Sequence, residues 1–170
     1  MNRALAPVTV VTLFIVGVQL SIFSSLRFAG VVVMLVWLWP LVVGLAGLTT
    51  VALWSAAIAG VFFDTHATTP FGLTAAVGVI LAYAASRLGK EGVGDLDSAA
   101  WWVTPALAGL AGLLAPLLYV IGGVVALSFS LWRSSLPEMM VVNAAAFAVL
   151  ARPLARVAQV VGGTGARARR

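Results

Sequence analysis

The chain has 170 residues, of which 62% are hydrophobic and only 9% are charged, and its mean hydropathy is +1.12. Soluble domains carry about 25% charged residues, so this composition predicts an integral membrane protein. At about 20 residues a span, five or six helices leave no room in these residues for a separate soluble domain. The sequence contains no cysteine, which excludes disulfides, thiolate nucleophiles and cysteine-ligated metal centres, and no cofactor is expected.

Apolar stretches predict transmembrane helices, and the working count is six. They cover residues 5–24, 31–48, 51–64, 70–87, 102–128 and 138–158. The second and third are only about 21 to 27 Å long, short of a hydrocarbon core of about 30 Å. Fused, they would make one overlong helix. Pro40 interrupts the backbone hydrogen bonds, while Gly47 followed by Thr49 and Thr50 supplies a helix stop and a new N-cap. A hairpin of two short helices is therefore predicted, and a five-span count stays open.

The distribution of basic residues sets the predicted orientation. With six spans and a cytoplasmic N-terminus, most basic residues fall on the cytoplasmic side, and only Arg27 and Arg133 fall outside. A five-span model with an external N-terminus gives the same division of charge. Both models place the C-terminus in the cytoplasm, and Asp64 and His66 on the outer side.

The net charge of +5 comes mostly from the C-terminal end of the chain. We expect one transmembrane domain over 1–161, followed by a flexible basic cytoplasmic tail over 162–170. The basic side chains suit an anionic inner leaflet, and nucleic acid is not an expected partner because no aromatic platform accompanies them. The arginines expected at the leaflet are Arg152, Arg156, Arg167, Arg169 and Arg170.

Small residues at four-residue spacing predict the faces on which helices pack or bind a partner, because they let backbones approach closely in lipid. In the third span this stripe ends in a carboxylate, Asp64. The residues expected on such faces are Ala52, Ala56, Gly60, Ala76, Ala108 and Gly112. The first span has a single Gly17 among large apolar residues, which is typical of a helix that faces lipid or a partner.

Gln19 and Asn143 are isolated polar residues in the first and sixth spans. Each is interpreted as making one interhelical hydrogen bond, with a place on a transport path as the alternative.

The stretch "GVFFDTHATTPFGLTAAVGVILAY", residues 60–83, contains a carboxylate and an imidazole in an otherwise oily region. Asp64 ends a span, so we expect it at the outer interface, where it can cap backbone N–H groups as Pro70 and Gly72 open the next helix. A catalytic pair with His66 and a threonine nucleophile, or a proton-coupled transport path, are the alternatives. The structural interpretation is favoured because no further buried ionisable groups accompany the pair.

The same stretch resembles the MreD family of rod shape-determining membrane proteins. The residues that carry the resemblance are Gly60, Asp64, Pro70, Gly72, Ala75 and Tyr83. The resemblance implies a non-enzymatic scaffold of the cell-wall elongation complex, a multi-pass protein of the bacterial inner membrane. It implies binding to an MreC-like single-span protein, and through it association with RodA, a class B penicillin-binding protein and, indirectly, the actin-like MreB. The segment after Asp64 includes His66, which departs from the Ser/Gly-rich turn of the family and leaves the role of His66 open.

The predicted span layout is also similar to that of the substrate-binding subunits of energy-coupling-factor vitamin transporters. Those subunits commonly carry an Ala-x-x-x-Ala face in the first helix, and none occurs between Leu5 and Phe23. A vitamin pocket would also need convergent polar groups near the outer loops, which the sequence does not supply. This transporter role is kept as the alternative function. The sequence leaves homodimerisation open.

Overall fold

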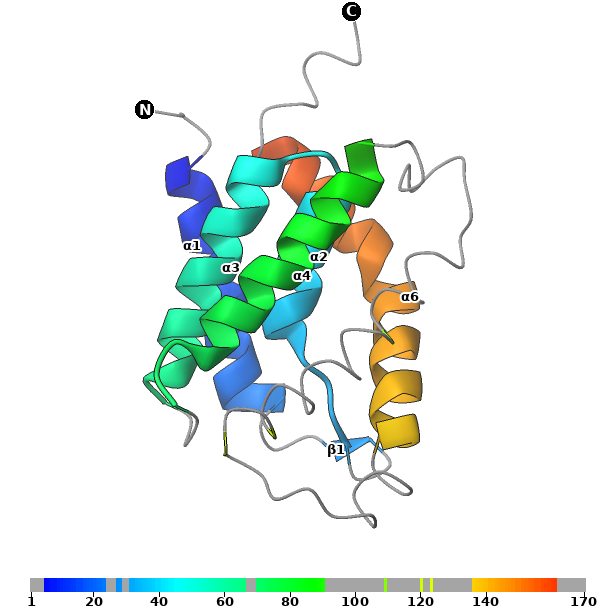
Figure 1. Cartoon of the computed structure of the whole chain (residues 1–170). Helices are drawn as coiled ribbons and strands as arrows, with labels where there is room; N and C mark the ends of the chain where they lie inside the picture. The colour runs from blue at the N-terminus through cyan, green and yellow to red at the C-terminus, as the bar shows by residue number, and fades with distance from the viewer. Residues whose placement is uncertain are drawn as a thin grey trace, which may run out of the picture.

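The computed structural model describes residues 5–23, 27–28, 31–66, 70–90 and 136–161, together with Gly109, Val120 and Gly123. These residues form a helical bundle (Figure 1). Its elements are α1 (Leu5–Val18), a π-helical turn η1 (Gln19–Phe23), α2 (Leu35–Leu45), α3 (Thr49–Asp64), α4 (Leu73–Lys90) and α6 (Leu136–Val161), with the two-residue antiparallel strands β1 (Arg27–Phe28) and β2 (Val31–Val32).

The predicted helical class is confirmed for the described residues, which are helical apart from the short β1–β2 pair and the connecting turns, and five of the six predicted spans correspond to helices there. The second predicted span begins too early, because Val31 and Val32 pair with β1 and the helix starts only at Leu35. The predicted fifth span, 102–128, and the tail, 162–170, lie outside the described residues apart from the three isolated positions.

The predicted hairpin of the second and third helices is present. Gly47, with φ of 77°, reverses the chain between α2 and α3, and a left-handed conformation of this kind favours glycine. The predicted threonine N-cap is wrong. Leu48 occupies the N-cap position of α3 without a side-chain cap, and the Thr49 hydroxyl is buried without a hydrogen-bond partner.

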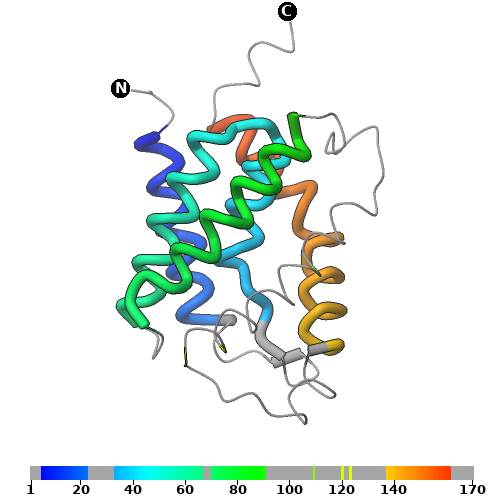
Figure 2. Tube along the Cα trace, viewed as in Figure 1, coloured from blue at the N-terminus to red at the C-terminus, as the bar shows by residue number. Residues whose placement is uncertain are grey.

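Helix α2 lies at the centre of the bundle, packed by α1, α3, α4 and α6. All eleven of its residues are buried, including Pro40 and the two large side chains Trp37 and Trp39. In Figure 2, α2 runs behind α3 and α4, with α1 and α6 to either side. A helix that is hydrophobic on every side fits such a central position.

The closest approach of α3 and α4 is at Gly60. A Cβ atom added there would overlap the backbone of Ala75 and would lie 2.8 Å from the Ala75 Cβ atom. Ala52 and Ala56 are buried on the same side of α3, so the predicted stripe is a packing face. Ala76 was predicted on the matching face of α4 but is exposed, because Ala75, one residue earlier, faces α3. The structure thus corrects the α4 face by one residue.

A second close crossing joins α2 and α4. A Cβ added at Gly44 would lie 2.9 Å from the Ala82 carbonyl oxygen and 3.0 Å from the Ser86 hydroxyl. Gly89 meets the backbone of α2 at Gly44 and Leu45 in the same way. These small residues hold α4 against the central helix.

The outer surface of the described bundle is largely apolar. Large hydrophobic side chains are exposed on every long helix, including Val10, Phe14, Trp54, Phe62, Ile80, Val141 and Val149. Two helical segments, Leu5–Ile22 and Pro137–Val161, are long and apolar enough to cross a membrane, whereas α2 and α3 are shorter apolar helices.

The Gly60 crossing predicts that Gly60→Ala lowers the free energy of unfolding in detergent by about 1 to 3 kcal/mol, because the new methyl group overlaps the Ala75 backbone. Gly17→Ala is the matched control, since a Cβ at Gly17 meets no atom within 4 Å. That control should be neutral or stabilising by up to about 1 kcal/mol. Equal losses in both variants would contradict the crossing.

Candidate functional site

The polar turn between α3 and α4 is organised by Asp64. This carboxylate is only 4% exposed, and its Oδ2 atom accepts hydrogen bonds from the Gly72 N–H at 2.9 Å and the Thr74 N–H at 3.1 Å. Both donors belong to the first turn of α4 or directly precede it, and the first N–H groups of a helix lack partners within the helix. Asp64 therefore caps α4 from the end of α3, as the sequence predicted.

The chain before α4 is shaped to present those N–H groups. Pro70 accepts a hydrogen bond at its carbonyl from the Leu73 N–H at 3.1 Å, and Gly72 has φ of 88°, a conformation that favours glycine. The Pro-x-Gly motif thus forms the tight turn that places the N–H groups of Gly72 and Thr74 next to the Asp64 carboxylate.

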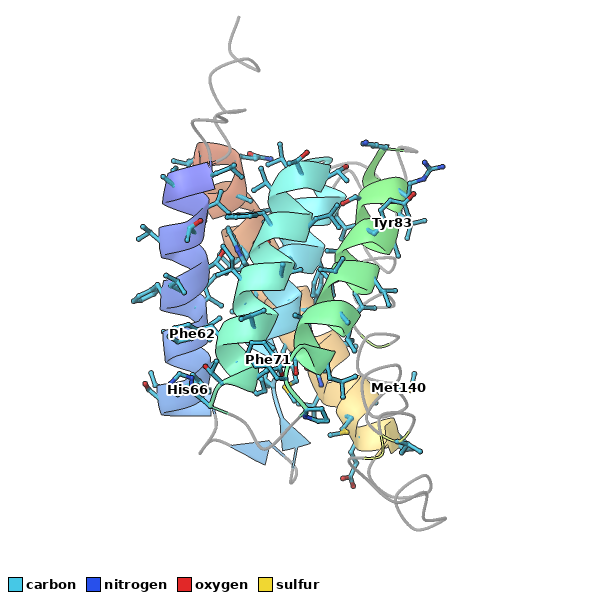
Figure 3. The ribbon with its side chains drawn as sticks, turned by 60° about the vertical axis from the view of Figure 1, so that its left-hand side comes forward. Phe62, His66, Phe71, Tyr83 and Met140 are labelled. Carbon is cyan, nitrogen blue, oxygen red and sulfur yellow. The ribbon has the colours of Figure 1, made fainter. Side chains whose placement is uncertain are left out.

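His66 does not join Asp64. It is exposed, and its Nδ1 lies 3.0 Å from the Phe62 carbonyl oxygen and 2.9 Å from the Thr65 hydroxyl. Its ring packs on Phe62 with centroids 5.1 Å apart, and both side chains lie at the same end of the bundle in Figure 3. The His66 ring therefore lies against the Phe62 carbonyl near the end of α3, and the structure gives no support to an Asp64–His66 catalytic pair.

The structure gathers most of the residues that carry the family resemblance. Gly60, Asp64, Gly72 and Ala75 meet at the α3–α4 crossing and its turn, and Pro70 lies within that turn. Tyr83 lies apart from them, exposed near the opposite end of α4 (Figure 3). The motif is thus one packed unit plus a separate surface tyrosine.

Gln19 and Asn143 each make the predicted interhelical hydrogen bond, and both bonds go to the start of α2. The Gln19 Oε1 atom accepts from the Leu35 N–H at 2.7 Å, and the Asn143 Oδ1 atom accepts from the Met34 N–H at 3.0 Å. Asn143 also donates through Nδ2 to the Met139 carbonyl at 2.9 Å. Two side chains, one from η1 and one from α6, therefore cap the buried helix α2.

Two tryptophan–threonine hydrogen bonds attach α1 to its neighbours, and sequence reasoning missed both. Trp39 Nε1 donates to the Thr12 hydroxyl at 3.0 Å, and Trp54 Nε1 donates to the Thr9 hydroxyl at 3.1 Å. The signal was the spacing of Thr9 and Thr12, which share one helical face. The α2–α4 crossing was also missed, although Ala82, Ser86 and Gly89 show the small-residue spacing that predicts such contacts.

The ionisable residues of the helices divide between the two ends of the bundle. Arg87 and Lys90 end α4, and Arg152 and Arg156 are exposed in the second half of α6, whereas Glu138 opens α6 at the other end. The predicted residues Ala108, Gly112, Arg167, Arg169 and Arg170 lie outside the described part of the chain. The neighbouring Gly109 is buried, and a Cβ there would lie 3.8 Å from the Ala144 Cβ atom of α6.

Within the described ranges, no group of three His, Cys, Asp or Glu side chains could hold a metal ion. Comparisons of the chain with protein-family models, with curated proteins and with solved structures give no match. The polar side chains of the described site form hydrogen bonds that join one helix to another.

Removing the Asp64 cap should destabilise the bundle. Asp64→Ala leaves the Gly72 and Thr74 N–H groups without this acceptor and should lower the free energy of unfolding in detergent by about 2 to 4 kcal/mol. Asp64→Asn keeps an acceptor oxygen and should cost about 1 kcal/mol. His66→Ala is the control and should cost less than either. A stable Asp64→Asn variant that abolished a pH-dependent ion flux would contradict this structural role.

The caps of α2 give a parallel expectation. Gln19→Leu and Asn143→Leu should each lower the free energy of unfolding by about 1 to 3 kcal/mol, because each removes the acceptor for a backbone N–H of α2. Ser21→Ala, at an exposed position of η1, is the control. Denaturant titrations followed by circular dichroism measure the three changes, and an unchanged Asn143→Leu variant would show that its cap does not stabilise the fold.

Proposed function

We propose that this protein is a non-enzymatic membrane scaffold that presents a rigid helical bundle to a partner's single transmembrane helix. The observation that carries the proposal is how the buried polar side chains are used. Thr12, Gln19, Asp64 and Asn143 all hydrogen-bond within the bundle, to backbone groups or to a tryptophan of a neighbouring helix. Polar groups used in this way stabilise the fold. They suit a protein that acts by presenting a fixed surface to a partner.

The proposed location is a bacterial inner membrane with the basic end of the bundle in the cytoplasm. The separation of Arg87, Lys90, Arg152 and Arg156 from Asp64 and Glu138 supports this orientation, since cytoplasmic segments are enriched in Lys and Arg. The exposed apolar side chains between the two ends supply a surface that lipid can cover.

Six spans are proposed, with both termini in the cytoplasm. α2 and α3 run as separate antiparallel helices. They therefore count as two spans and not as one fused, overlong helix. α4 ends at the basic end, whereas α6 begins at the opposite end, which is the placement that one further crossing between them would require.

The partner face is proposed on α1. Its buried residues Val8, Thr12 and Val16 face the bundle, whereas Phe14 on the other side is 71% exposed. Gly17 has open space around it, so another helix can approach the α1 backbone there.

The proposed partner is an MreC-like single-span protein, and the proposed role is maintenance of rod shape and lateral peptidoglycan synthesis with RodA, a class B penicillin-binding protein and, indirectly, MreB. The support for this assignment is the resemblance of the Gly60, Asp64, Pro70, Gly72 and Ala75 unit to the MreD family. Its residues pack as one unit, which suits a motif whose function is structural.

Capture of the partner tests the proposal. Full-length protein purified in mild detergent should retain an MreC-like protein. Gly17→Leu should reduce the captured amount about tenfold while the bundle stays folded, because the leucine fills the space that a partner helix would approach and its Cβ meets no atom of the bundle within 4 Å. Ile80→Leu, at an exposed position of α4, is the control and should retain the partner.

Depletion in the source cells separates the two function classes. Rounding of the cells supports the morphogenesis role. Vitamin auxotrophy with normal shape, together with capture of an ATPase module, would contradict it and favour the transporter subunit.

A further inference from the structure

The outer face of α6 carries a charge at each of two positions that lie fourteen residues apart. Glu138 and Arg152 are both exposed, and this spacing returns to nearly the same side of a helix. Between them the exposed side chains are apolar, with Val141 67% and Val149 73% exposed. At 1.5 Å per residue, the apolar face of α6 is about 21 Å long.

The outer face of α4 has the same length. It begins at Leu73, directly after the polar turn capped by Asp64, and its first charge is Arg87, which is exposed fourteen residues later. The exposed side chains between include Ile80 and, one turn before Arg87, Tyr83. Tyrosine is enriched at the membrane interface, so its position agrees with a boundary near Arg87. This apolar face is again about 21 Å long.

Helix α3 gives a third measure. It runs from Thr49 to Asp64, which is about 22 Å, and its exposed Trp54 lies near the first of these ends. Helices α3, α4 and α6 therefore share one apolar height, although their boundaries are formed by different residues. Helix α1 with η1 is longer, about 27 Å, and a helix longer than the surrounding hydrocarbon layer fits into it by tilting.

The remainder of α6 does not extend this height. Proline inside a helix removes a backbone hydrogen bond and bends the helix. Pro153 lies inside α6, directly after Arg152. Beyond it, Ala158 packs in one apolar cluster with Val8 of α1 and Val51 of α3. Figures 1 and 2 show this last part of α6 turning across the end of the bundle.

The surface of that last part is amphipathic. Arg156 is exposed on it beside the apolar Val157 and Val160, while Ala155 and Ala158 are buried beneath. A short helix with this pattern suits the headgroup layer, where arginine meets phosphate and valine meets the ends of the acyl chains. The boundary of the apolar belt on α6 is therefore Arg152, and the residues after it lie along the interface.

We propose that the protein carries an apolar belt about 21 Å tall and that its preferred partner is a hydrocarbon layer of this thickness, about a third thinner than the usual 30 Å. This inference rests on the proposed membrane location but not on the proposed partner protein. A charged side chain at the centre of a bilayer costs at least about 3 kcal/mol. A difference between the height of the belt and the thickness of the hydrocarbon layer costs a fraction of 1 kcal/mol for each Å. Short-chain lipids therefore gather around the bundle, or the bilayer thins there.

Lipid binding in vesicles tests the belt. The full chain is reconstituted in dimyristoleoyl, dioleoyl or dierucoyl phosphatidylcholine, and quenching of tryptophan fluorescence by brominated analogues gives relative affinities, with Trp54 on the lipid-facing surface as one reporter. We expect dimyristoleoyl lipid to bind at least about three times more tightly than dioleoyl lipid. An optimum at dioleoyl or a longer chain would overturn the inference.

A double variant moves the boundary. Arg87→Leu with Arg152→Leu removes the boundary charges of α4 and α6 and extends the apolar face of α4 to Lys90, so the optimum should shift towards dioleoyl lipid. Val149→Leu leaves both boundaries in place and should keep the dimyristoleoyl optimum. An unchanged optimum in the double variant would contradict the assigned boundaries.

The lipid preference and the partner capture can fail separately. A short-chain optimum in a protein that captures no partner supports the belt and overturns the scaffold. Partner capture with a dioleoyl optimum supports the scaffold and overturns the belt. Protein recovered in the soluble fraction of cell lysates, without detergent, would overturn the membrane location on which both depend.

Discussion

The first N–H groups of a helix have no partners within that helix, and this bundle has to satisfy those of its buried helices. Helix α2 poses the problem most sharply, because all eleven of its residues are buried. Gln19 and Asn143 supply acceptors to Leu35 and Met34 at its start. Asp64 does the same for α4 through Gly72 and Thr74. Each acceptor comes from another helix or from the end of the preceding one, so satisfying a helix start also fixes the position of its neighbour.

The caps and the small-residue crossings act together. Gly60 brings the backbones of α3 and α4 into contact one turn before Asp64, so the carboxylate is already close to the start of α4. Gly44 and Gly89 place the other end of α4 against α2. The polar side chains point inward to these tasks and the large apolar side chains point outward. This arrangement suits a proposed function in which the outer shape, presented to lipid and to a partner helix, matters more than any interior chemistry.

Local patterns predicted much of this arrangement. Apolar runs located the described helices to within a few residues, and the order of Asp64, Pro70 and Gly72 predicted the cap because all its parts lie close in the chain. The acceptor role of Gln19 and Asn143 was predicted from their isolation, but their common target was not, since it depends on which helix becomes central. The face of α4 was misplaced by one residue, at Ala76 instead of Ala75, because helix rotation is set by packing. The Gly44 crossing was missed because α2 is hydrophobic on all sides and shows no period that marks a face.

Hydrogen–deuterium exchange of the backbone amides in lipid nanodiscs tests the central claim most directly. If Gln19, Asn143 and Asp64 satisfy the starts of α2 and α4, the amides of Met34, Leu35, Gly72 and Thr74 should exchange as slowly as those in the middle of α2. The Gly72 and Thr74 amides should become fast in Asp64→Ala, while Met34 and Leu35 stay slow. Rapid exchange at all four amides in the unaltered protein would contradict the account.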